Sequence, residues 1–304
     1  MSDPALPPPT IDPHHHLWDL ERHYYPWLSD PMKPSLVGDY SMLRHSYLAA
    51  DFLADIARQN IVKSVHLEAG HDKRHPLTET RWLQAIADDP RWHGFPHGFV
   101  AYADFSDPGV EAVLAGHCEF ANMRGIRQIL NHHPDPTFNF VDRDYMEEPA
   151  WCANFGLLGK YRLSFDLQLY FPQMPAAAAL ARRYPDIQII LNHTGTPVDR
   201  DPDSLKAWSR GMRLLAQCPN IATKISGLGM VDHRWTIESI RPFVLETIEM
   251  FGVERSMFAS NFPVDKMFSD YDTLWNAFRT ITAGFTPAER TALFHDNAAR
   301  FYRL

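Results

Sequence analysis

Histidines cluster near the start of the chain, where residues 12–16 read Asp-Pro-His-His-His. Successive side chains of a strand point to opposite faces, so the spacing predicts that Asp12, His14 and His16 share one face. His15 is then expected on the other face. Two imidazoles on one face are typical of a metal site or of a group that polarises a substrate. The alternative is a His-rich turn or a tag remnant, which seldom lies inside an apolar segment.

Later apolar segments also end in polar residues that could do chemistry. Such residues are costly to bury in a strand unless they are paired or functional. We expect His193 to join His14 and His16, either as ligands of one divalent metal, most simply zinc, or as hydrogen-bond donors to a substrate without metal. The spacing leaves both alternatives open because ligand distances cannot be read from sequence. The further candidates at segment ends are Glu68, Arg127, Gln168, Tyr170, Lys224, Asn261 and Asp265.

Two cations among these candidates could bind substrate. Arg127 could hold a carboxylate through two hydrogen bonds, and its alternative is a buried ion pair with Glu68 or Asp166. Lys224 could polarise a carbonyl or hold an anion, or it could pair with a carboxylate. The other residues expected to contact substrate are Gln168, Tyr170 and Trp18.

The elements that position these residues follow a repeating pattern. Strand-like segments alternate with helical ones, for example 78–88 and 236–251, which favours parallel βαβ units and a single-domain (β/α)8 TIM barrel over residues 10–304. In such barrels the active site lies at the carboxyl ends of the strands. Long connections at 18–47 and 132–145, after the first and fourth strands, are expected to form pocket walls. The expected strands are 10–16, 62–68, 97–104, 123–130, 163–170, 187–193, 221–226 and 256–261.

Composition limits the partners and the cellular location that can be expected for the protein. The 304 residues carry a net charge of −8 without a basic stripe, so a nucleic-acid partner is not expected, and neither is a membrane. Three widely spaced cysteines favour a reducing, cytoplasmic location. The partner expected is a small-molecule substrate, and a homo-oligomer is compatible with the sequence. The Pro-rich residues 1–9 lack the features of a signal peptide and are expected to form a flexible arm.

In combination, several segments resemble the amidohydrolase-related group of the amidohydrolase superfamily, which includes pyrone-dicarboxylate lactonase and sugar-lactone hydrolases. The resemblance implies a (β/α)8 barrel that opens a small polar or anionic lactone by attack of water on the ester carbonyl. It also implies a divalent metal in some members, whereas others act without one. The segments that carry it are 11–19, Gly-Ile-Arg at 125–127, Asn-His-Thr-Gly at 192–195, Lys-Ile-Ser-Gly at 224–227 and 297–302.

One position departs from the family pattern. The family usually has an Asp after the eighth strand, as metal ligand or general base, where this chain has Asn261. An amide cannot take a proton from water, so we expect Asp265 or Glu68 to activate the water instead. Strand five has Gln168 where a histidine ligand would be needed, and strand four has no lysine for a bridging carbamate, so a binuclear site is not expected.

Two other functions remain alternatives. A metal-dependent decarboxylase of the same superfamily would release carbon dioxide and need the strand-eight Asp, so Asn261 counts against it. A degenerate barrel would bind a small ligand without turning it over. Since function is argued from the site rather than from the fold, the retained polar groups favour the hydrolase.

Overall fold

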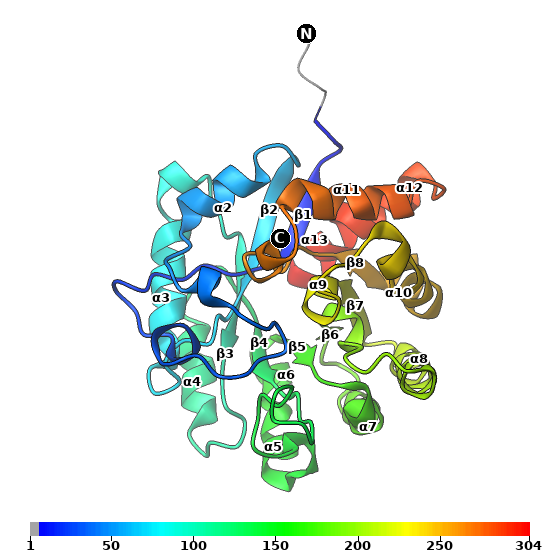
Figure 1. Ribbon diagram of the computed structural model, residues 1–304. Helices are drawn as coiled ribbons and strands as arrows, with labels where there is room; N and C mark the ends of the chain where they lie inside the picture. Colours follow the sequence, from blue (N-terminus) through cyan, green and yellow to red (C-terminus); the bar gives the residue numbers. More distant parts are fainter. Residues whose placement is uncertain (1–5) are drawn as a thin grey trace.

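Eight parallel strands form a barrel in the computed structural model, which describes residues 6–304 (Figure 1). Each strand pairs with the next along the chain. Between the last and the first, the backbone N–H of Asn261 donates to the carbonyl of His14 (2.7 Å), and that of His16 to the carbonyl of Phe262 (2.7 Å). The predicted (β/α)8 barrel is therefore confirmed. The strands are β1 (Thr10–His15), β2 (Ile61–Leu67), β3 (Gly98–Tyr102), β4 (Met123–Ile129), β5 (Ser164–Gln168), β6 (Ile189–Leu191), β7 (Ile221–Ile225) and β8 (Ser256–Phe258).

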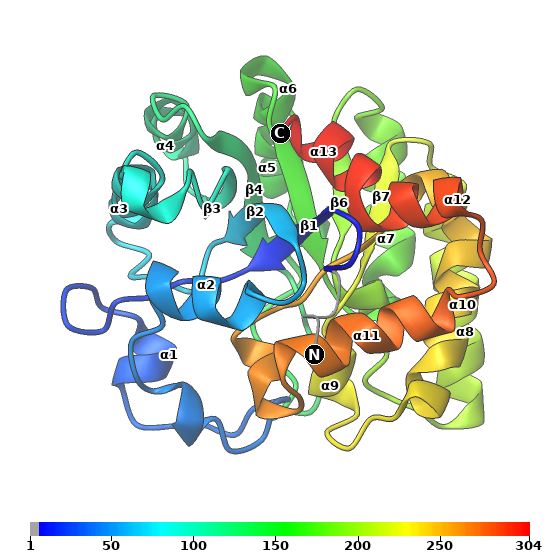
Figure 2. The ribbon, with the colours of Figure 1, turned by 90° about the horizontal axis from the view of Figure 1, so that it is seen from above.

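Helices surround the strands (Figures 1 and 2), and some of them begin at a side-chain cap. The Thr236 side chain accepts from the backbone N–H of Ser239, and that of Thr286 accepts from Glu289, which fixes two helix starts. The helices are α1 (Pro26–Ser29), α2 (Ala49–Ile56), α3 (Pro76–Ala87), α4 (Val110–His117), α5 (Pro149–Phe155), α6 (Leu157–Tyr161), α7 (Met174–Arg183), α8 (Pro202–Ala216), α9 (Leu228–Val231), α10 (Ile237–Phe251), α11 (Tyr271–Ile281), α12 (Pro287–Thr291) and α13 (Asn297–Tyr302).

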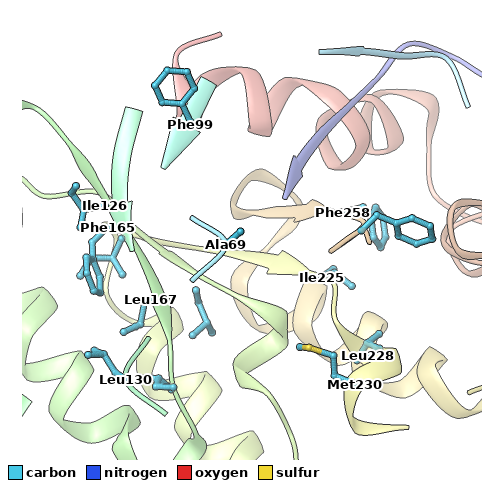
Figure 3. Close-up of a cluster of buried hydrophobic side chains, with 14 of the residues drawn as sticks. Ala69, Phe99, Ile126, Leu130, Phe165, Leu167, Ile225, Leu228, Met230 and Phe258 are labelled. Atoms are coloured by element: carbon cyan, nitrogen blue, oxygen red, sulfur yellow. The ribbon is translucent and has the colours of Figure 1, made fainter. Parts of the chain in front are cut away.

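Apolar side chains form two layers. The outer layer lies between strands and helices, and Figure 3 shows part of it, with Ile126 of β4 beside Phe165 of β5. The inner layer fills the barrel, where side chains from most strands meet Ala298 and Tyr302 of α13. This helix lies where the strands begin, because Asn297 Nδ2 donates to the carbonyl of Ser256, the first residue of β8 (2.8 Å). In Figure 2, α13 lies at the opposite end of the barrel from α1 and α9.

The two long connections follow β1 and β4, as the sequence predicts. The first contains α1, and a backbone pair between Trp18 and Tyr47 closes its base (3.0 and 2.9 Å). Residues 1–5 of the expected arm lie outside the described residues, and the carbonyl of Pro7 accepts from Asn60 Nδ2 (2.8 Å). Along residues 6–304, no helix is both long enough and apolar enough to cross a bilayer.

Candidate active site

The end of β1 differs from the regular strand that the sequence predicts. Its register against β2 shifts between Asp12 and His15, which marks a bulge. The Asp12 carboxylate accepts from the Ser260 hydroxyl (2.5 Å) and from the hydroxyl of Tyr271, the first residue of α11 (2.9 Å). The prediction that Asp12 lies on the face of the two neighbouring imidazoles is wrong, because the extra residue changes the alternation.

Three of the predicted site histidines come together at the mouth of the barrel. The ring centroids of His14 and His16 are 5.0 Å apart, and those of His14 and His193 are 4.6 Å apart. All three are buried, and burial lowers their pKa values well below the usual range, so each ring is neutral. A neutral imidazole has one donor and one acceptor nitrogen, and the partner of each nitrogen decides which is which.

His16 presents an acceptor to the site. Its Nδ1 lies 2.8 Å from the carbonyl oxygen of Leu67, which can only accept, so Nδ1 carries the proton. Nε2 then has a lone pair and lies 3.4 Å from Oδ1 of Asn261, which is also an acceptor. Two acceptors that face each other are suited to share a donor such as water.

Asp265 fixes the orientation of that amide. Asn261 Nδ2 donates to Oδ2 of Asp265 (2.6 Å), which directs Oδ1 toward His16. The other carboxylate oxygen accepts from the backbone N–H of Gly229 (3.1 Å). Burial raises the pKa of Asp265 to about 7. The structure thus brings Asp265 to Asn261, and places the amide between this carboxylate and the histidines.

His14 presents a donor to the site. Its Nδ1 lies 3.4 Å from Nζ of Lys224, which donates to Oδ1 of Asp166 (2.6 Å). Burial lowers the pKa of Lys224 to about 8, opposed by the charge of Asp166, so the amine is an ammonium at neutral pH. An ammonium can only donate, which leaves the His14 proton on Nε2. Nε2 is buried and has no hydrogen-bond partner among residues 6–304.

Arg127 makes three hydrogen bonds within the protein. Nε donates to Oε1 of Glu68 (2.8 Å), Nη2 to the Glu68 carbonyl, and Nη1 to Oε1 of Gln168 (3.0 Å). Both charged side chains are about 5% exposed or less. Of the two roles expected for Arg127, the structure contains the buried ion pair with Glu68. Because the Glu68 carboxylate is bound to Arg127, it is not free to act as a base.

The aromatic candidates support the loops over the mouth. Trp18 Nε1 donates to the carbonyl of His45 (2.7 Å), and the Tyr170 hydroxyl to the carbonyl of Phe138 (2.6 Å). Phe138 also lines a cleft of about 490 Å³. Its wall residue Met230 has Sδ 3.4 Å from Asn261 Nδ2, which connects cleft and site. The cleft is lined by Leu36, Phe138, Val198, Met230, Val231, Asp232, His233 and Arg234.

The three histidines do not fit a metal ion in this arrangement. Within the described range 6–304, no group of three or more His, Cys, Asp or Glu side chains could hold one. A ligating imidazole needs a lone pair on the nitrogen that faces the metal. His16 meets this condition, whereas the free nitrogen of His14 carries its proton.

Glu79 is a buried residue near the site that the sequence reasoning missed. It lies in the first turn of α3, where a glutamate is usually an exposed helix-start residue, so no sequence signal distinguishes it. It is 3% exposed and accepts from the backbone N–H of Ala69 (3.1 Å). Burial and the nearby charge of Glu68 raise its pKa to about 8.

This raised pKa predicts a pH-dependent stability. Between about pH 4.5 and pH 8 the folded protein keeps the Glu79 proton that the unfolded chain releases, so stability falls as pH rises. One such proton corresponds to about 1.4 kcal/mol per pH unit. Glu79→Gln is expected to flatten this slope in urea unfolding at pH 5 and pH 8. Glu111→Gln is the control, since that carboxylate is only partly buried and pairs with Lys160. Parallel pH profiles for wild type and Glu79→Gln would contradict the assignment.

Comparison with known proteins places the chain among related enzymes. The amidohydrolase family model matches residues 11–304. An uncharacterized protein of Sinorhizobium fredii is 55% identical over the full length of both chains. An L-fucono-1,5-lactonase of Burkholderia ambifaria is 25% identical, covering 97% of this chain and 95% of the relative. The crystal structure of a Burkholderia multivorans amidohydrolase with bound zinc has a TM-score of 0.79 at 24% identity, covering 99% of this chain and 100% of that one.

Proposed function

Because the chain belongs to the amidohydrolase family, and is a hydrolase, we propose that it opens a small, uncharged, hydroxyl-bearing lactone by attack of water on the ester carbonyl. Relatives with lactonase names along nearly the whole chain support this activity. One observation carries the proposal. Two acceptors, His16 Nε2 and Asn261 Oδ1, face each other 3.4 Å apart, beside the proton-bearing Nε2 of His14.

These groups divide the chemistry between them. Water donates to His16 Nε2 and Asn261 Oδ1, adds to the carbonyl carbon, and passes a proton to His16. The carbonyl oxygen becomes an oxyanion that accepts from Nε2–H of His14 and of His193. In this scheme the Ser226 hydroxyl, which lies 2.9 Å from His193 Nδ1, donates to that nitrogen, so that the His193 proton is on Nε2. The ester C–O bond then breaks, and the proton on His16 goes to the leaving ring oxygen.

The role of Asp265 in this scheme is to orient the water through Asn261. Its hydrogen bond to Nδ2 prevents the amide from turning its NH2 group toward His16. Each oxyanion donor typically contributes about 3–4 kcal/mol to the barrier reduction. The histidines therefore account for most of the proposed rate enhancement, and Asp265 preserves the geometry.

Charge pairing supports an uncharged substrate. Arg127 is compensated by Glu68, and Lys224 by Asp166, so the buried cations near the histidines each have a carboxylate partner. A substrate carboxylate would have to compete with these partners in a buried site.

One buried amide supports a substrate that bears hydroxyls. Asn192 follows β6, is fully buried, and has a side-chain amide without a hydrogen-bond partner among residues 6–304. An amide offers both donors and an acceptor, which match a hydroxyl group.

A lactone panel tests this function. L-fucono-1,5-lactone and L-rhamnono-γ-lactone represent uncharged substrates, and 2-pyrone-4,6-dicarboxylate represents anionic ones. We expect acid release without carbon dioxide for an uncharged lactone, and a kcat/KM about 100-fold lower for the dicarboxylate. Carbon dioxide release would support the decarboxylase instead. Thermal stabilisation by a lactone without hydrolysis would support a non-catalytic barrel.

Chelation tests the role of zinc, which a related crystal structure contains. Because the His14 proton occupies the nitrogen that a metal would need, we expect hydrolysis to persist after dialysis against a chelator. The measurement is lactone turnover together with elemental analysis, on protein purified without a His tag. Activity that disappears with the metal and returns with zinc would make His14, His16 and His193 a metal site.

A further inference from the structure

A chain of buried polar groups runs from α13 through the barrel to the site. The Tyr302 hydroxyl donates to Oδ1 of Asp166 (2.7 Å), the same oxygen that accepts from Lys224 Nζ (2.6 Å). Nζ lies in turn 3.4 Å from His14 Nδ1, and 5.0 Å from the centre of the Tyr302 ring. Tyr302, Lys224, Asp166 and His14 are all fully buried.

We propose that Tyr302 and Asp166 are positioning residues for the lactone hydrolysis proposed above, on which this inference rests. They hold the Lys224 ammonium against Nδ1 of His14 and thereby place the His14 proton on Nε2. Neither residue touches the substrate. They act through the lysine on the nitrogen that donates to the oxyanion.

Asp166 receives both of its donors on Oδ1, whereas Oδ2 has no hydrogen-bond partner among residues 6–304. A buried carboxylate is stable only when it is paired and hydrogen-bonded. The ammonium supplies the charge, and the Tyr302 hydroxyl satisfies the same oxygen without competing for His14. The Tyr302 ring beneath the ammonium adds a cation–π contact, so that the lysine is held from two sides.

Nitrogen NMR of protein with 15N-labelled histidine tests the proton placement directly, because long-range 1H–15N correlations distinguish the two tautomers. In the wild type we expect His14 to carry its proton on Nε2. The double variant Asp166→Asn/Lys224→Met removes both charges together and keeps an amide oxygen as acceptor for the Tyr302 hydroxyl. In this variant we expect a signal from protonated Nδ1 of His14. A wild-type proton on Nδ1, or the same tautomer in both proteins, would overturn the proposal.

Tyr302→Phe tests the positioning role of the hydroxyl. We expect kcat to fall about 10-fold with KM unchanged, because a hydrogen bond to a charged group is lost outside the substrate contacts. Tyr184→Phe is the matched control, since that hydroxyl donates to the carbonyl of Cys152 (2.7 Å), away from the site. Equal kcat values in the two variants would remove Tyr302 from the proposal.

The two proposals fail in different ways. A wild type that carries the His14 proton on Nε2 but hydrolyses no lactone would end the proposed function and leave the proton placement standing. A wild type that hydrolyses a lactone but carries the His14 proton on Nδ1 would end the proposed proton placement and leave the proposed function standing.

Discussion

His193→Asn is expected to lower kcat at least about 100-fold while the protein stays folded. The substitution removes one of the two proposed oxyanion donors, and losing one such donor typically costs 10²–10³ in kcat. Asparagine suits the backbone, because His193 has a φ of +55° and asparagine tolerates that region better than most residues. Steady-state kinetics on the best lactone, with circular dichroism and thermal unfolding, measures both parts.

A matched control separates the imidazole from its support. Ser226→Ala removes the hydroxyl 2.9 Å from His193 Nδ1 and leaves the ring in place. We expect a smaller loss of kcat than in His193→Asn, because the ring can still reach the substrate in a mixture of tautomers. A His193→Asn enzyme with near-normal kcat would exclude His193 from the mechanism.

Arg127→Met is expected to reduce the free energy of unfolding by about 3–5 kcal/mol, because it leaves the Glu68 carboxylate buried without its cation. Glu68 is 3% exposed and cannot recover this loss by contact with water. Urea unfolding at neutral pH measures the change.

The double variant Glu68→Gln/Arg127→Met tests the cause. Removing both charges should restore a large part of the lost stability, since replacing both members of a buried pair costs less than removing one. If the double variant is no more stable than Arg127→Met, the loss comes from packing around Arg127 rather than from an uncompensated charge.

The barrel was predictable because its signals are local. Apolar segments at regular spacing and the caps at Thr236 and Thr286 need only neighbouring residues, and strands and helices form where these patterns predict them. The convergence of His14, His16 and His193 follows from the same rule, because the carboxyl ends of parallel strands meet at one face.

The features of the site that the sequence did not predict depend on contacts between distant segments. The bulge that turns Asp12 away is a property of how β1 pairs with β2, and its local signal is Pro13, which lacks a backbone N–H and lies where the register shifts. The sequence offered two carboxylates as partners for Arg127. Only the three-dimensional structure shows that Glu68 pairs with Arg127 and Asp166 pairs with Lys224. Tyr302 is remote in sequence from every residue it serves, so its hydroxyl gave no signal.

The closure of the barrel joins catalysis to folding order. The backbone hydrogen bonds from Asn261 to His14 and from His16 to Phe262 connect the first and last strands. His16 and Asn261, 245 positions apart in sequence, also supply the two acceptors that we propose bind water. Contacts over such separations form late, because a long loop must close first. Partly folded chains can thus hold most of the barrel and yet be inert, and recovery of activity during refolding should report the meeting of the first and last strands rather than helix formation.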